Sequence, residues 1–147
     1  MNDHAVFEYA VLRVVPRVDR GESMNAGVVL HCRARDFLAT RVHLDRERLR
    51  ALDPHADADA VESLLATLAE VTAVPEPPRS DRRSTGALAA TGPGAGEDIG
   101  RRFRRLTTAR STIVQPGPVH TGLTTDPAAE TDRLLACLVL PLDAGHP

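Results

Sequence analysis

The residues most able to do chemistry lie in one short segment between two apolar stretches. Residues 16–30 read PRVDRGESMNAGVVL and contain Arg20, Glu22 and Asn25. A planar guanidinium binds phosphate or carboxylate, an asparagine amide can orient such a ligand, and a glutamate can act as a base or support the arginine. The segment therefore predicts a candidate anion-binding loop between two strands, although it matches no known catalytic signature.

The same segment also has a purely structural interpretation. Gly21 allows a positive φ, and Asn25 and Gly27 suit turns and β-bulges. Arg20 and Glu22 could form a salt bridge that holds the loop in place, or Glu22 could neutralise Arg13 of the preceding strand. The sequence favours this structural interpretation for the glycines and the asparagine, and it leaves the role of the Arg20 and Glu22 side chains open.

A second candidate surface is a run of arginines in residues 98–110, which read DIGRRFRRLTTAR. Apolar residues that include Phe103 and Leu106 recur there at helical spacing, so one side of a helix is expected to face the core. Five arginines against one aspartate give the segment a charge of +4. A solvated helix face is the simpler explanation, and the functional one is that Arg101 and Arg104 bind a phosphate group or an acidic partner.

The patterns of several other site classes are missing from the chain. It contains no GxxxxGK[ST], no GxGxxG after a strand and no GxSxG, which excludes the usual phosphate-loop, dinucleotide and serine-hydrolase sites. It also has no CxxC or HExxH, and its six histidines are scattered, so neither a metal site nor a cofactor is predicted. Only His31 and His43 could approach each other across paired strands, and both are expected to face solvent.

The composition describes one small domain without a dominant charge. A chain of 147 residues can bury a single core, and 18 basic against 20 acidic side chains leave a net charge of -2, which disfavours nucleic acid and membrane surfaces as partners. Asp3 and Glu8 interrupt any signal peptide, and no window approaches the roughly 20 apolar residues of a membrane span. Cys32 and Cys137 lie in apolar contexts typical of reduced thiols, so a cytoplasmic location is expected.

Three strands are predicted to form an antiparallel meander at the N-terminus. They cover residues 7–15, 26–32 and 37–43, where apolar and β-branched side chains predominate. The first has apolar residues at both parities, so we expect a central strand that is covered on both faces. Arg13 within it then needs a carboxylate or an exposed edge. A further strand is predicted near 111–115.

Two helices are predicted after the meander. A short one begins near Asp45 and must end before Pro54. A longer one is capped by Asp57 or Asp59. Its buried stripe is predicted to consist of five apolar residues at spacings of three and four: Val61, Leu64, Leu65, Leu68 and Val71.

The C-terminal half contains a linker, a turn and a last helix. Residues 75–97 are rich in proline and glycine and predict a flexible linker or insertion inside the single domain. The Pro-Gly-Pro sequence at 116–118 is expected to force a turn. A helix that starts at Asp126 and Pro127 should bury four apolar residues: Leu134, Leu135, Leu138 and Val139. Together the elements predict an α+β fold with a small antiparallel sheet and three to four helices.

Several of these segments resemble a bacterial family known as domain of unknown function 3037. The resemblance rests on FEYAVLRVVP, RGESMNAGVVL, FLATRVHLDRERLRAL and RFRRL, and on a final helix that begins with DP and ends with LLACLV. It covers nearly the whole chain outside the linker. The family supplies no activity. Its genes are associated with kinases that resemble the HipA toxin, so the resemblance implies a kinase of this kind as a possible partner.

The combined observations favour a non-enzymatic interaction or regulatory module. The alternative is an enzyme or sensor for an anionic ligand, phosphorylated or nucleotide-like, that uses the loop containing Arg20, Glu22 and Asn25. Nucleic-acid binding by the arginine-rich helix is the least favoured function, and it would weaken steeply with added salt.

Overall fold

The computed structural model describes residues 3–73, 94–108 and 112–142. It confirms the predicted α+β fold, with one antiparallel sheet and four α-helices in the described ranges. In chain order the elements are β1 (Ala5–Val14), β2 (Met24–Cys32), the 3-10 turn η1 (Arg33–Arg35), β3 (Phe37–Val42), α1 (Arg46–Leu52), α2 (Ala58–Ala73), α3 (Gly94–Leu106), β4 (Val114–Pro116), β5 (His120–Thr124) and α4 (Pro127–Leu138).

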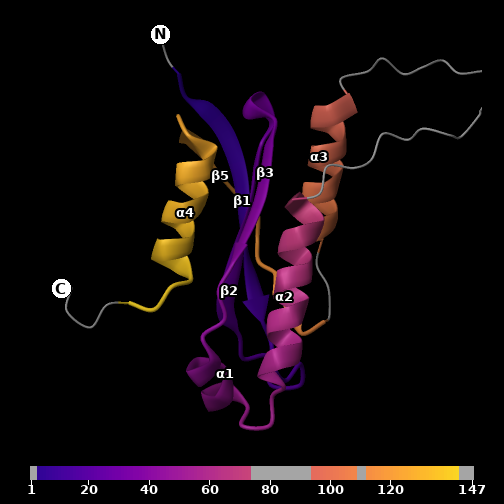
Figure 1. The fold of residues 1–147 in the computed structure, drawn as a ribbon, viewed down its shortest axis with the longest axis vertical. Coiled ribbons are helices and arrows are strands. Elements are labelled where there is room, and N and C mark those ends of the chain that lie inside the picture. The colour runs from indigo at the N-terminus through magenta and orange to yellow at the C-terminus, as the bar shows by residue number, and fades with distance from the viewer. Residues whose placement is uncertain (1–2, 74–93, 109–111, 143–147) are drawn as a thin grey trace, which may run out of the picture.

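The sheet is built around β1. Its strand order is β3-β2-β1-β4, and β5 also pairs with β1. The predicted meander of β1, β2 and β3 is therefore confirmed. Figure 1 shows α4 on one side of the sheet and α2 and α3 on the other. Successive side chains of a strand point to opposite faces, so Phe7 packs toward α4 while Ala10 and Leu12 pack toward α2 and α3. The expected burial of β1 on both faces holds for Phe7 on one face and for Ala10 and Leu12 on the other, whereas Val6 is exposed.

The predicted turn at Pro116-Gly117-Pro118 is wrong, because the chain continues in one direction along β1. β4 pairs with the end of β1 through Val14 and Val114, and β5 pairs with its beginning through Ala5 and Thr124. The Gly117 N–H still donates to the carbonyl of Val11 at 2.7 Å. The two prolines lack an N–H, so they interrupt the edge of the sheet without reversing it.

Helix α2 begins at its predicted cap, but the set of side chains that it buries differs from the predicted one. The Asp57 carboxylate accepts the N–H of Ala60 at 3.0 Å. Val61 and Leu65 face the core, whereas Leu64 and Val71 are exposed, which corrects the prediction for those two residues. The buried residues follow the spacing 58, 61, 65, 68 and 72, and this leaves positions 64 and 71 on a flank of the helix.

The last two helices also differ in detail from the sequence prediction. Helix α3 begins at Gly94, inside the predicted linker over 75–97, and the rest of that linker up to residue 93 falls outside the described residues. In α4, Asp126 caps the N–H groups of Ala128 and Ala129 as predicted. Leu138, expected to be buried, is partly exposed because it is the last helical residue, and Val139 takes the buried position after it.

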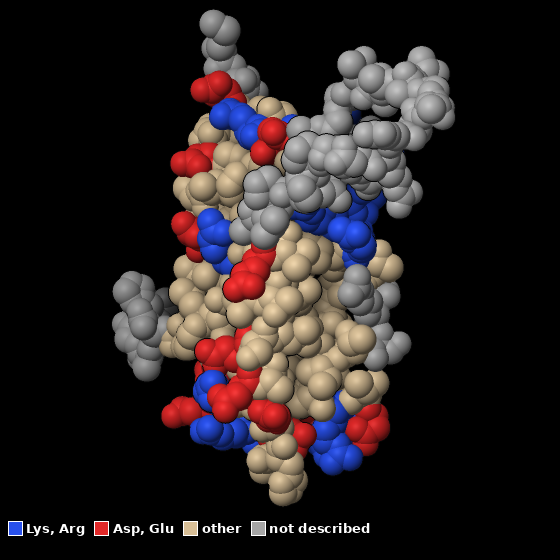
Figure 2. Space-filling model, turned by 45° about the vertical axis from the view of Figure 1, so that its right-hand side comes forward, with Lys and Arg blue, Asp and Glu red and all other residues tan. Residues whose placement is uncertain are grey.

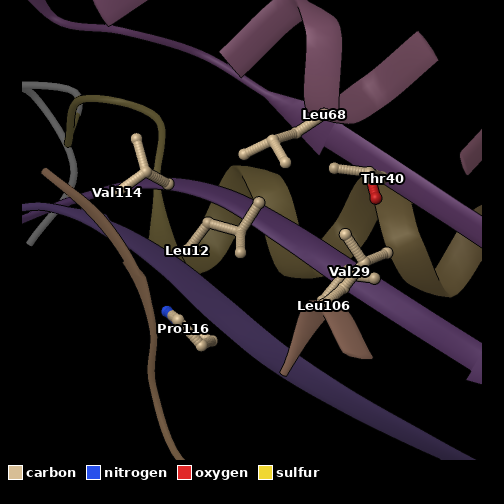
Figure 3. A pocket seen from close by; sticks show the side chains of 7 residues that line it. All are labelled: Leu12, Val29, Thr40, Leu68, Leu106, Val114 and Pro116. Atoms are coloured by element: carbon tan, nitrogen blue, oxygen red, sulfur yellow. The ribbon is translucent and has the colours of Figure 1, made fainter. Parts of the chain in front are cut away.

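A small internal cavity of about 20 Å³ lies between the sheet and the pair α2 and α3. Figure 3 shows the side chains around it, which are almost all apolar: Leu12, Val29, Thr40, Leu68, Leu106, Val114 and Pro116. Thr40 Oγ1 is buried and has no hydrogen-bond partner among the described residues. The Thr40 hydroxyl has therefore lost its hydrogen bonds to water without gaining one from the described residues.

Candidate functional site

The predicted anion loop forms a tight turn in which Arg20 and Glu22 bind each other. The N–H groups of Arg20 and Gly21 donate to the carbonyl of Arg17 at 3.1 and 3.2 Å, and Gly21 has φ 69°. Arg20 Nε donates to Glu22 Oε1 at 2.5 Å, and the two exposed side chains form an ion pair. The turn chemistry predicted for Gly21 is thus present, and within this arrangement Glu22 neutralises the guanidinium.

Asn25 and Gly27 shape the entry into β2. The register between β1 and β2 shifts after Leu12, which pairs with Gly27, because Arg13 pairs with Asn25 and skips Ala26. This is a β-bulge. Asn25 Nδ2 donates to the carbonyl of Leu138 at 3.0 Å and so ties the end of α4 to the sheet. A Cβ on Gly27 would lie 2.9 Å from the Arg41 carbonyl oxygen, so the strands need a glycine there.

The structure does not bring the loop and the arginine-rich helix together. The loop joins β1 to β2 at the lower end of Figure 1, next to α1, whereas α3 lies beside the upper part of the sheet. Arg20 and Glu22 are therefore at one end of the molecule, and Arg101 and Arg104 are at the other. A single cleft walled by the loop and by α3 is not formed.

Helix α3 is anchored to the sheet by Phe103, which is 2% exposed. Arg104 next to it is exposed, as are Arg101 and Arg105, so these three side chains match the expected solvated face. Arg102 differs, because it is largely buried beside Phe103. Figure 2 shows arginine side chains gathered on the α3 side of the upper half, above a largely uncharged band.

The upper end of the sheet contains a buried histidine that the sequence prediction placed in solvent. His31 is only 7% exposed, so the expectation of a solvent-facing side chain is wrong. Its ring stacks on Phe103 of α3 with ring centres 5.4 Å apart, and α3 passes close enough that a Cβ on Gly100 would lie 3.6 Å from His31 Cε1. His31 pairs with Leu38 near the start of β3, whereas His43 lies just after the end of β3 at Val42. The two histidines therefore do not face each other.

The carboxylate of Glu8 lies on the same face of the sheet as His31. The two residues are direct partners in the β1–β2 register, and such pairs present their side chains on one face. Burial lowers the pKa of the His31 imidazole below its ordinary value, an effect that Glu8 opposes and that Arg104 and Arg33 reinforce. His31 is therefore neutral at pH 7, and its Nε2 has no hydrogen-bond partner among the described residues.

An open cavity of about 630 Å³ lies over this pair of residues. Its lining combines titratable and apolar side chains from β1, from the residue before β1, and from β2 and η1: His4, Ala5, Val6, Glu8, His31, Arg33 and Ala34. This volume is within the range of small-molecule sites. We call this hollow the His31 cavity. It contains neutral imidazole, carboxylate and guanidinium groups, which can bind an anion and transfer protons.

A pair of exposed apolar side chains borders the same end of the sheet. Val6 of β1 and Leu123 of β5 are cross-strand partners, and they are 60% and 63% exposed. Helices α2 and α4 make their main sheet contacts with β2 and β3, so the half of the sheet that contains β5 is less covered. We call β5 together with Val6 the β5 edge.

The comparison with known families agrees with the resemblance seen in the sequence. The model of the family described as "Protein of unknown function (DUF3037)" matches residues 9–139. The chain belongs to this family. The DUF3037 match begins at Tyr9 in β1 and ends at Val139 after α4, so it includes the predicted loop, His31 and α3. No curated protein and no solved structure matches the chain.

Other site classes receive little support from the part of this DUF3037 protein that the structure describes. Within that part, no group of three His, Cys, Asp or Glu side chains could hold a metal ion. No described helix is long and apolar enough to cross a bilayer. Cys32 is buried in the core as its apolar context suggested, whereas Cys137 is exposed on α4. The cysteine predictions therefore hold for one residue of the two.

Sequence reasoning missed the pairing of Glu8 with His31. The sequence did contain a usable signal. Both strands were predicted, and the register of a hairpin between them determines which residues of β1 and β2 share a face of the sheet. The bulge at Ala26 shifts that register, however, and nothing in the sequence fixed its position. The approach of α3 to His31 is a long-range contact that periodicity alone does not predict.

Proposed function

We propose that the protein is a non-enzymatic interaction module that binds a protein partner along the β5 edge. The observation that supports this function best is the exposure of Val6 and Leu123, two large apolar side chains that lie next to each other on paired strands. Adjacent exposed apolar residues of this size are typical of surfaces that another protein covers.

The backbone of β5 strengthens the proposal. Among the described residues β5 pairs only with β1, so its outer N–H and C=O groups are available to a further strand. Proteins commonly protect such edges with charges, prolines or bulges. The neighbouring β4 has Pro116 and the interruption after it, but the β5 sequence HTGLT contains no proline and no lysine, arginine or carboxylate. This composition suits strand addition by a partner.

The partner is proposed to supply an extended segment with an apolar residue that packs between Val6 and Leu123. The first partner to test is a kinase that resembles the HipA toxin, because the family resemblance implies one. A module of this kind would regulate the partner by binding and sequestering one of the partner's segments.

The test is co-purification from the native host with the tagged chain, followed by mass spectrometry. Leu123→Lys places a charge in the centre of the β5 edge, and it should reduce recovery of the partner at least tenfold, which is about 1.4 kcal/mol of binding free energy. Leu142→Lys is the matched control, because Leu142 is 89% exposed and lies after α4, away from β5. Equal recovery with both variants would refute the use of this edge.

The competing hypothesis is an enzyme or sensor for an anionic ligand at the loop of Arg20, Glu22 and Asn25. It predicts ligand binding or turnover that Arg20→Ala or Glu22→Gln abolishes and that Leu123→Lys leaves unchanged. The two hypotheses thus differ in which end of the sheet is sensitive to substitution.

A further inference from the structure

We propose that the His31 cavity is a binding site for a phosphate monoester, carried either by a small molecule or by a phosphorylated peptide side chain. This inference goes beyond the partner surface on β5, because it shares only Val6 with that surface and concerns a defined chemical group. It is supported by the charges around the cavity and by the unused hydrogen-bonding capacity of His31.

The first argument is that Arg33 in the cavity lining and Arg104 near His31 have no carboxylate partner among the described residues. Several arginines of the described residues form ion pairs, among them Arg20, Arg41 and Arg46. No ion pair between described residues includes Arg33 or Arg104. Arg33 lines the cavity from η1, and Arg104 on α3 lies near enough to act on the charge of His31. Two guanidinium groups of this kind favour an oxyanion.

The second argument concerns His31 itself. Its side chain is buried within the cavity wall, and Nε2 lacks a partner among the described residues. Buried polar atoms in proteins nearly always form hydrogen bonds, so an unpaired one in the wall of a cavity calls for an explanation, such as a bound water or ion. A neutral imidazole donates from one nitrogen and accepts at the other, so it can bind a phosphate oxygen without adding charge.

The third argument is the carboxylate opposite His31. Glu8 is half-buried and forms no ion pair with a described residue. A negative side chain repels a bare anion, so the cavity should select a ligand that also carries a hydrogen-bond donor near its phosphate. O-phosphoserine has an ammonium group in this position, and a phosphoserine peptide has backbone N–H groups. The volume of about 630 Å³ can hold either of them.

The experiment is an NMR titration of the full chain at pH 7 with two probes, O-phosphoserine and a short phosphoserine peptide with blocked ends. Saturable shifts of the His31 ring and of α3 amides are expected with at least one probe. Serine and the unphosphorylated peptide should give none. Saturation by the amino acid alone identifies a small-molecule ligand, and saturation by the peptide alone identifies a modified protein segment.

Variants assign the binding to the proposed side chains. Arg33→Gln and Arg104→Gln should each weaken binding about tenfold, the loss expected for one charge-assisted hydrogen bond. Arg48→Gln is the matched control, because Arg48 is exposed on α1 at the opposite end of the sheet. His31→Phe keeps a ring against Phe103 and removes both nitrogens, so it should weaken binding while the spectrum elsewhere stays unchanged.

Two results would overturn the proposal. One is the absence of saturable shifts with both probes at millimolar concentration. The other is equal affinity of wild type, Arg33→Gln and Arg104→Gln. Neither result depends on a protein partner. Failure of the phosphate site and failure of the β5 edge can therefore be told apart.

Discussion

His31 connects three elements through one ring. It lies on β2, faces Glu8 of β1 and stacks on Phe103 of α3. The ring is removed from water, and this favours its neutral form over the imidazolium. The charges around it act in opposite directions, since Glu8 and Asp36 favour the imidazolium and Arg104 and Arg33 disfavour it. Burial decides the balance, so the pKa of His31 falls below 6.5.

This pKa predicts how stability depends on pH. As the pH falls, the unfolded chain binds the proton of His31 before the folded chain does. The contribution of His31 to the free energy of unfolding is therefore complete above about pH 6.5 and is lost as the pH falls through the folded-state pKa. Urea unfolding should show a larger loss between pH 7 and pH 5 for wild type than for His31→Phe. Parallel losses in the two proteins would show that His31 titrates normally.

Thr40 provides a second prediction at the level of a single side chain. Its buried hydroxyl has no partner next to the apolar cavity of Figure 3, so Thr40→Val should raise the free energy of unfolding by about 1 kcal/mol. Thr131→Val is the control, because Thr131 is also buried but its Oγ1 donates to the Pro127 carbonyl at 2.7 Å. That variant should lose about 1 kcal/mol. A similar loss for Thr40→Val would mean that its hydroxyl is satisfied.

The secondary elements were largely predictable, because short-range patterns determine most of them. Asp45 and Asp126 accept the first N–H groups of their helices, and alternating apolar residues define β1. The errors occur where one pattern is compatible with two structures. Leu64 and Val71 fit a helical apolar stripe, yet they lie on a flank that the sheet does not cover. Pro116-Gly117-Pro118 can interrupt an edge strand as well as reverse the chain.

The candidate sites were less predictable than the elements. The salt bridge between Arg20 and Glu22 involves residues two apart in one turn, so the sequence suggested it directly. The His31 cavity is lined by side chains of β1, β2 and η1, and α3 packs against His31 beside it. Its formation depends on the register set by the bulge at Ala26 and on where Phe103 anchors α3. Neither the position of the bulge nor the anchoring of α3 by Phe103 can be predicted from a local sequence pattern.

Gly27 gives a prediction for the pairing of β2 with its neighbours. A Cβ there would meet a backbone oxygen, that of Arg41, at 2.9 Å, and also the Val42 side chain at 3.1 Å. Gly27→Ala should therefore cost about 2 kcal/mol in thermal or urea unfolding, because a strand must move. Gly21→Ala is the comparison, since its Cβ would meet nothing and only φ 69° opposes it, which costs about 1 kcal/mol. A smaller loss for Gly27→Ala than for Gly21→Ala would exclude the close strand contact.

The whole molecule separates its two charged candidate regions along the sheet. The loop with Arg20 enters β2 at Met24, whereas α3 meets the same strand at His31. At about 3.3 Å per residue this step spans roughly 20 Å. That distance exceeds the screening length of about 8 Å at physiological salt, so charges at the two ends should influence each other weakly.

Independence of the two ends is testable with a double-variant cycle on Arg20→Ala and Arg104→Gln. Substitutions that share no partner add within about 0.5 kcal/mol. Arg20→Ala should leave the phosphoserine affinity unchanged, and the double variant should bind like Arg104→Gln alone. The unfolding free energies should also add, with a loss below about 1 kcal/mol for Arg20→Ala because its ion pair is exposed. A coupling well above this limit would instead require that the loop and α3 contribute to one site, because only a shared ligand could link side chains this far apart.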